Sequence, residues 1–113
     1  MIRSVSADGI QIGADLYDRT IALTVDAVLD DWTAEDVSDL KEADFSNLLE
    51  LAPEVIVLGT GSSNIFPLRE LVFAMARRRV GFEFMDTAAA ARTFNVLASE
   101  GRQVAAVLYL PDE

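Results

Sequence analysis

The sequence predicts a single α/β domain with a parallel sheet at its centre. Residues 54–110 alternate three short apolar runs with two segments of helical periodicity. This order is typical of parallel strands that are joined by crossover helices. The first run ends in Gly-Thr-Gly at 59–61, and the second ends in Asp-Thr at 86–87. Ligands of such sheets bind at the carboxyl ends of the strands, so these two loops are where we expect a site.

Length and composition indicate one domain that covers residues 1–113. Apolar residues make up 51% of the chain, which is enough for a hydrophobic core and excludes a disordered protein. No apolar run approaches the ~20 residues of a membrane span. The strand-like start at 1–5 resembles neither a signal peptide nor a transit peptide. The expected location is the cytoplasm, without stable membrane insertion.

The N-terminal part predicts an antiparallel meander. Asp8-Gly9 is a favoured two-residue turn between the first two strands. Residues 13–18 are predicted as a loop. The next segment alternates two sets of side chains at the period-two spacing of a strand, and Val28 and Trp32 should anchor its continuation. The predicted strands are 2–7, 10–12, 19–25 and 27–32.

The acidic segment at 33–41 is ambiguous. Its start at Thr33 has the spacing of a capping box, and both a short helical turn and an irregular loop remain open. Asp44 is predicted to cap a helix over residues 45–51, which has apolar side chains at helical spacing. Pro53 should end this helix, because proline disrupts a helix interior.

The second half predicts the parallel core. The apolar run at 55–58 is typical of a central strand that is buried on both faces. Pro67 suits the first turn of a helix, three arginines suit its C-terminal end, and Gly81 should stop it. The last helix carries small and apolar residues on one face and should end at Gly101. The predicted strands are 55–58, 82–85 and 104–108, and right-handed crossovers place helices at 67–79 and 87–100 against the sheet.

Composition excludes several kinds of chemistry. The chain has no cysteine and no histidine, which excludes thiol nucleophiles, disulfides, zinc–thiolate sites and His-based triads. The net charge is −10, and it resides in residues 1–54 because residues 55–113 are balanced. Such a charge repels phosphate backbones, so nucleic acid is not an expected partner. We favour a solvated acidic face that promotes solubility over an acidic docking surface.

The first candidate site is the loop at Gly59, Thr60, Gly61 and Ser62. Glycines let a backbone approach a ligand closely, and free amides at a helix start hold anions. However, Asn64 stands where the dinucleotide fingerprint has its third glycine, and the loop lacks the lysine of a phosphate-binding Walker loop. We favour a tight strand-to-helix turn with a positive φ over an anion-binding loop.

The second candidate site lies on the last helix. Asp86 at a strand end suits a general base or a ribose ligand, but an Asp directly before a helix is more often its N-cap. The cap is the favoured interpretation for Asp86 and Thr87. Arg92, Asn95 and Ser99 share the polar side of this helix. They suit gripping a carboxylate, a partner or the acidic half of the chain, and a solvated helix face is the alternative.

Three segments carry a family resemblance. Leu-Gly-Thr-Gly at 58–61, Phe-Pro at 66–67 and Met-Asp-Thr-Ala-Ala-Ala-Ala-Arg-Thr-Phe-Asn at 85–95, continuing to 102, resemble a small family that includes the mitochondrial NADH dehydrogenase (complex I) assembly factor 3 and an adipogenesis-associated protein. The resemblance covers nearly the whole chain. It implies a three-layer α/β fold with a mixed central sheet and no established enzymatic activity. That family often has Cys where this chain has Ala91 and Tyr where it has Phe94, so chemistry of those groups would be absent here.

Residues and resemblance together favour a non-enzymatic binding or assembly module with a protein partner, acting as an accessory factor for a complex I-like respiratory assembly. The alternative is a small-anion or metabolite-binding protein, or an unidentified enzyme, with a crevice between residues 59–64 and 86–87. The predicted ligand-binding or partner-binding residues are Gly59, Thr60, Gly61, Ser62, Asp86, Thr87, Arg92 and Asn95. No catalytic residue, metal site or cofactor is predicted, and the sequence leaves a homo-oligomer open.

Overall fold

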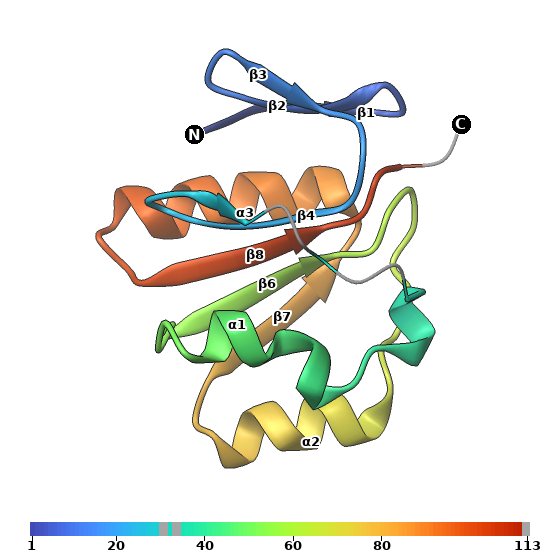
Figure 1. The fold of residues 1–113 in the computed structure, drawn as a ribbon, viewed down its shortest axis with the longest axis vertical. Helices are drawn as coiled ribbons and strands as arrows, with labels where there is room; N and C mark the ends of the chain where they lie inside the picture. The colour runs from blue at the N-terminus through green and yellow to red at the C-terminus, as the bar shows by residue number, and fades with distance from the viewer. Residues whose placement is uncertain (30–31, 33–34, 112–113) are drawn as a thin grey trace.

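A computed structural model describes residues 1–29, 32 and 35–111 of the chain, and its strands form two sheets (Figure 1). The antiparallel sheet contains, in order, β1 (Ile2–Ser6), β2 (Gly9–Ile12) and β3 (Asp15–Tyr17). The five-stranded mixed sheet has the order β5-β4-β8-β6-β7 and contains β4 (Ile21–Thr24), β5 (Val28–Leu29), β6 (Val55–Gly59), β7 (Gly81–Met85) and β8 (Val104–Leu108). The helical segments are η1 (Val37–Asp39), η2 (Glu42–Phe45), α1 (Ser46–Leu49), α2 (Arg69–Arg77) and α3 (Thr87–Ser99).

The predicted parallel core is confirmed. β6 pairs in parallel with β7 on one side and with β8 on the other, so that Val55 lies opposite both Gly81 and Val104. Every residue of β6 is buried, as expected of a central strand that is covered on both faces. Alternate residues of a strand point to opposite faces. Accordingly, Val57 packs in one hydrophobic core, whereas Ile56 packs in the other.

Three layers surround these two cores. α3 and the β1–β3 sheet cover one face of the five-stranded sheet, and α1 and α2 lie on the other face (Figure 1). The chain passes from β6 outward to β7 and then back across β6 to β8. Crossovers of one hand therefore place α2 and α3 on opposite faces. The mixed three-layer arrangement implied by the family resemblance is confirmed.

The N-terminal strands differ from the prediction. The predicted loop at 13–18 is wrong, because Asp15–Tyr17 pair with β2 as a third strand. The predicted hairpin is present, but its turn lies at residues 7–8 and Gly9 begins β2. A Cβ on Gly9 would lie 2.7 Å from the Tyr17 carbonyl oxygen. Glycine is therefore required at this position for close packing of β3 as well as for its backbone conformation.

The predicted meander is divided between the two sheets. β4 and β5 leave the first three strands, and β4 pairs antiparallel with β8. Ile21 and Leu23 pack in the core beneath α3, while Ala22 packs in the core beneath α2. The period-two alternation predicted for this strand therefore distinguishes two faces that are both buried, and not a buried face from an exposed one. Trp32 packs against the second core, as the anchor prediction requires.

The middle segment begins its helical structure earlier than predicted. The helix predicted at 45–51 is replaced by the 3₁₀ turn η2, which runs directly into the four-residue α1. The Asp44 carboxylate accepts a hydrogen bond from the Lys41 N–H at 2.9 Å, so it caps η2 and not a helix that starts at 45. The predicted capping box begins at Thr33, which lies outside the described residues. The helical turn in this acidic segment is η1.

The two longer helices follow the predicted patterns with adjusted ends. α2 ends at Arg77, and Arg79 adopts a left-handed φ of 60°, so the chain turns before Gly81 and that glycine begins β7. Leu71 and Met75 of the predicted apolar stripe are buried. α3 matches its prediction closely, and Gly101 follows it with a φ of 80°.

Candidate functional site

The strand-end loops that sequence analysis selected do lie side by side. The Thr60 N–H donates to the Met85 carbonyl at 2.8 Å, which joins the end of β6 to the end of β7. The Gly61 N–H donates to the Thr87 hydroxyl at 2.8 Å, and the Thr87 N–H donates to the Gly61 carbonyl at 2.9 Å. The loop at 59–61 and the first turn of α3 are therefore joined by reciprocal hydrogen bonds.

These hydrogen bonds occupy two of the backbone amides that an anion at this loop would need. The amides of Thr60 and Gly61 donate to protein oxygens, and Thr87, the first residue of α3, is fully buried. The Asp86 carboxylate accepts from the Ala89 N–H at 2.9 Å. This confirms Asp86 as the N-cap of α3 and fills the position where an anion would bind at a helix start.

The glycines of the loop have structural tasks. Gly61 has a φ of 101°, which confirms the predicted tight turn with a positive φ. A Cβ on Gly59 would lie 2.9 Å from the Thr87 Cα, so this glycine lets α3 approach β6 closely. α2 begins only at Arg69, on the other face of the sheet, and the intervening loop separates its N-terminus from the strand end.

A hollow of about 330 Å³ adjoins the loop. Its lining includes Thr60, Gly61 and Ile65 from this loop, together with Asp36 and Tyr109. The Tyr109 hydroxyl donates to the Glu35 carbonyl at 2.7 Å and accepts from the Trp32 indole N–H at 3.3 Å. Burial raises the pKa of Tyr109, and nearby carboxylates act in the same direction. No Lys or Arg of the described residues lines this hollow, so its charge does not favour an anion.

Arg92 and Asn95 lie apart from those loops, on the part of α3 that faces β1. The Asn95 Oδ1 accepts from the Ile2 N–H at 3.0 Å, and the Asn95 Nδ2 donates to the Ile2 carbonyl at 2.8 Å. Arg92 is exposed one turn earlier on the helix. The predicted site residues thus form two groups: one at 59–62 with 86–87, and one at Arg92 and Asn95.

Sequence analysis missed a third member of the second group, Arg3. The pairing of β1 with β2 shifts between Ile2 and Ser4, so Arg3 is the extra residue of a β-bulge. Arg3 and Arg92 line a hollow of about 320 Å³ together with Asn95. Neither guanidinium forms an ion pair with a described residue. A bulge leaves no local signature in an otherwise regular strand pattern, which is why Arg3 was missed.

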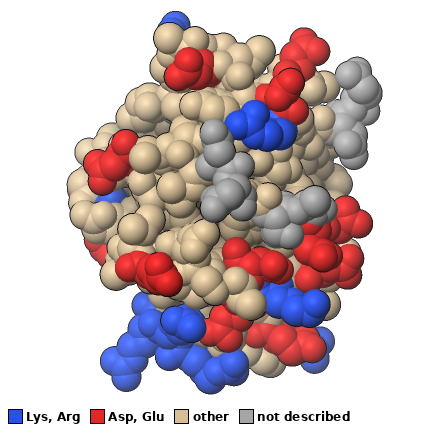
Figure 2. Space-filling model, in the orientation of Figure 1, with Lys and Arg blue, Asp and Glu red and all other residues tan. Residues whose placement is uncertain are grey.

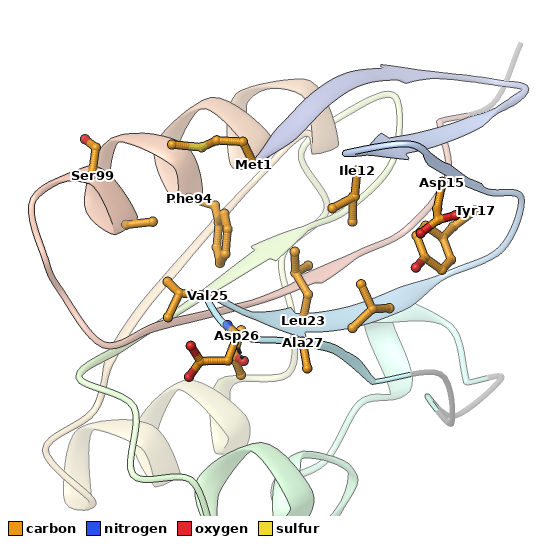
Figure 3. Close-up of a pocket in the computed structure, with 13 residues that line it drawn as sticks. Met1, Ile12, Asp15, Tyr17, Leu23, Val25, Asp26, Ala27, Phe94 and Ser99 are labelled. Atoms are coloured by element: carbon orange, nitrogen blue, oxygen red, sulfur yellow. Dashed lines mark hydrogen bonds between the residues drawn. The ribbon is translucent and has the colours of Figure 1, made fainter.

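A larger cleft of about 370 Å³ opens between the β1–β3 sheet, the β4–β5 turn and α3 (Figure 3). Leu23 and Phe94 project toward its centre, and Asp15 and Asp26 lie on opposite sides of it. No Lys or Arg of the described residues lines the cleft. Sequence analysis did not find it, because its walls come from segments far apart in the chain and Asp15 was assigned to a loop.

Charge is unevenly distributed over the surface. Basic side chains gather at one end of the molecule over α2, with several acidic side chains beside them (Figure 2). Some opposite charges pair: Arg78 contacts Glu42 at 2.5 Å, and Arg102 contacts Glu54 at 3.0 Å. The pKa of Glu54 is lowered by its hydrogen bond from the Gln103 N–H and by Arg102.

The described residues also limit other kinds of site. No three His, Cys, Asp or Glu side chains among residues 1–29, 32 and 35–111 are placed to hold a metal ion. Within the same ranges, every helix falls short of the length and apolar composition that a membrane crossing requires.

Comparison with curated proteins identifies relatives of two kinds. The complex I assembly factor 3 of Danio rerio, named NADH dehydrogenase [ubiquinone] 1 alpha subcomplex assembly factor 3, is 34% identical over 113 residues. The alignment covers 98% of this chain but only 64% of the fish protein, so the chain spans less than two thirds of that relative. A Francisella tularensis protein named 13 kDa major membrane protein is 27% identical over 93 residues, which cover 81% of this chain and 76% of that protein.

Solved structures show the same fold. A solution NMR structure of a Xanthomonas campestris protein matches with a TM-score of 0.89 at 34% identity and covers 97% of this chain and 83% of that chain. A crystal structure described as an outer membrane protein of Bartonella henselae matches with a TM-score of 0.84 at 28% identity and covers 98% and 94%.

One family model matches residues 2–109, almost the complete chain, and its description is a protein of unknown function. The relatives, the shared fold and this match agree with the resemblance carried by the strand-end and α3 sequences. The chain therefore belongs to the DUF498/DUF598 family, whose model matches residues 2–109.

Proposed function

We propose that this chain is a non-enzymatic protein-binding module that assists the assembly of a larger complex, and that this complex is a respiratory assembly of the complex I type. The observation that carries the proposal is the similarity, over 98% of the chain, to a protein named as an assembly factor of NADH dehydrogenase. The shared region is the whole described domain, so an activity of this domain in that relative would use the same scaffold.

The arrangement of the predicted site residues favours binding over catalysis. Asp86 and Thr87 are polar side chains just beyond the end of β7, and both bond to backbone groups of the chain itself. A general base needs to reach a proton on its substrate, whereas the Asp86 carboxylate is directed at the first turn of α3. The strand-end loops therefore serve as a joint that holds the domain together.

Two surface features suit a protein partner. Arg92 is exposed and unpaired among the described residues, beside a hollow. On the other face, Phe66 is 74% exposed and its ring contacts Phe84 with centroids 5.3 Å apart. Exposed aromatic and arginine side chains are enriched at the energetic centres of interfaces. We place the protein in the cytoplasm, where its contact with a membrane complex would pass through a subunit of that complex.

Affinity capture from cells that express a tagged chain at its native level tests the proposal. We expect specific capture of one respiratory-complex subunit or subassembly, and we expect Arg92→Glu to reduce its recovery. Arg69→Glu is the matched control, because Arg69 is an exposed arginine on α2 at the opposite face of the sheet. Failure to capture a reproducible partner with the wild-type chain would contradict the proposal.

A further inference from the structure

We propose that the groove between the outer edge of β1 and α3 binds an extended acidic segment of a protein partner, which adds to β1 as a further strand while Arg3 and Arg92 hold its carboxylates. The inference rests on the proposed protein-binding function and specifies its site and the chemistry of its partner. Four features carry it: an open sheet edge, outward-pointing backbone groups, a bulge that displaces Arg3, and the local charge.

The first feature is the open edge. β1 is the outermost strand of the three-stranded sheet, and its free side faces α3. Asn95 already pairs with this edge: its amide accepts from the Ile2 N–H and donates to the Ile2 carbonyl. These are the two bonds that the backbone of an adjacent strand would make. Asn95 thus stands where an adjacent strand would pair with Ile2. A partner strand would continue this pairing at Val5, where the edge remains open.

The second feature is the direction of the next backbone groups. Hydrogen-bonded and non-hydrogen-bonded pairs alternate along an antiparallel ladder. Ile2 lies opposite Ile12. The Ile2 N–H and carbonyl point away from β2, because both of them bond to Asn95. Two residues back along β2, Ile10 lies opposite Val5. The Val5 N–H and carbonyl therefore also point out of the sheet edge, into the groove.

The third feature is the bulge at Arg3. In a regular strand, alternate side chains face the core, yet here Ile2 and Val5 both pack against the core beneath α3. The extra residue permits this and leaves Arg3 and Ser4 exposed in succession. Bulges commonly redirect a side chain beside a functional surface. The result is an arginine at the edge of the groove, on the strand to which a partner would pair.

The fourth feature is local charge. Arg92 and Arg3 line the groove from its two walls, and no Asp or Glu of the described residues lines it. Ala88 and Ala91 on the α3 side leave room, because their side chains are small. The chain as a whole has a net charge of −10, so this groove is a local exception that favours carboxylates over basic segments. Arginine is well suited to bind carboxylates in a bidentate manner.

An extended peptide fits these features better than a free anion does. A small anion would use the guanidinium groups and leave the Val5 N–H and carbonyl to water. An extended peptide offers both a donor and an acceptor to Val5 and also carries carboxylates within reach of both arginines. Main-chain bonds to the edge would supply affinity, and the arginines would supply specificity.

A peptide-display library of random decapeptides, selected on the intact wild-type chain, tests this inference. We expect the selected peptides to share acidic residues, and synthetic copies to shift the backbone NMR signals of residues 2–5 and 88–95. Arg3→Glu and Arg92→Glu should each weaken binding about tenfold, since each replaces an attraction by a repulsion. Arg69→Glu, on the other face, should leave affinity unchanged. Replacing central peptide residues by proline should abolish binding, because proline removes backbone donors.

Several outcomes would overturn the inference. Selection of peptides without acidic residues, or NMR shifts located elsewhere, would exclude this groove. Inorganic phosphate or free glutamate displacing the peptide at equal concentration would show a small-anion site instead. Arg3→Gln and Arg92→Gln keep the test valid if a charge reversal impairs folding. If the captured cellular partner binds equally well to both reversed variants, the groove fails while the proposed function stands. If no partner is captured but acidic peptides bind here, the proposed function fails while the groove stands.

Discussion

Asn95 holds Ile2 by both of its backbone groups: the side-chain amide accepts from the Ile2 N–H at 3.0 Å and donates to the Ile2 carbonyl at 2.8 Å. The two residues are 93 positions apart in the chain. This pair fastens the three-stranded sheet to α3. The sequence suggested that Asn95 grips a partner or another part of the chain, and the structure shows it gripping the chain's own first strand.

Replacing Asn95 by Ala should destabilise the protein by about 1–3 kcal/mol, because it leaves two partly buried backbone groups of Ile2 without their partner. Chemical denaturation, followed by the fluorescence of the single tryptophan, measures this change. Ser99→Ala is the control: the Ser99 hydroxyl is exposed and donates only to Val96 of the same helix, so the change should stay within about 0.5 kcal/mol. Equal stabilities of the two variants would refute the fastening role.

Asp86→Ala should lower stability by about 0.5–2 kcal/mol, whereas Asp86→Asn and Asp86→Ser should recover most of the loss. The reason is that either side chain can accept the hydrogen bond from the Ala89 N–H that Asp86 accepts now. The denaturation midpoint of each of the three variants measures its stability. The amount of partner that each variant captures measures its function. An Asn variant that is stable yet fails to function would show that Asp86 acts as more than a cap.

Thr87→Val should cost about 1–3 kcal/mol although it barely changes the size of the side chain. The buried hydroxyl accepts from the Gly61 N–H and donates to the Tyr109 carbonyl, and valine leaves both without a partner. Thr87→Ser keeps the hydroxyl and should lose only about 1 kcal/mol. Urea denaturation of the valine and serine variants measures both losses of stability. A serine variant that is less stable than the valine variant would show that Thr87 contributes through packing and not through its hydrogen bonds.

Tyr109→Phe should reduce stability at neutral pH by about 1–2 kcal/mol, because the hydroxyl bonds to both Glu35 and Trp32. Burial raises the pKa of Tyr109 in the folded protein above its ordinary value. The unfolded chain therefore ionises first as pH rises through about 10, and the contribution of Tyr109 is lost as pH rises toward the folded pKa. The difference in unfolding free energy between wild type and variant should narrow as pH rises above about 10. A constant difference would contradict the raised pKa.

The parallel core could be predicted from sequence because its signals are local. The buried run of β6 and the apolar face of α3 each specify their element and its neighbours within a few residues. β3 could not be predicted in this way: it contains Asp15 and the exposed Leu16, and it exists because Gly9 lets it approach β2. Such edge strands depend on contacts that a local pattern does not encode.

The candidate site divides along the same line. The cap at Asp86 and the turn at Gly61 follow from local backbone chemistry and were predicted. Arg3 and Arg92 line the same groove because of a bulge in β1 and because β1 packs against α3. Their proximity could therefore be found only in the folded structure. The same is true of the acidic cleft in Figure 3, whose walls come from distant parts of the chain.

The most direct test of the proposed assembly function is the assembly state of the respiratory complex in cells that lack this chain. Native gel electrophoresis should show less mature complex I-type assembly and an accumulated subassembly. A wild-type copy and Arg69→Glu should restore the mature complex, and Arg92→Glu should restore it poorly. An unchanged amount of mature complex in cells without the chain would contradict the account.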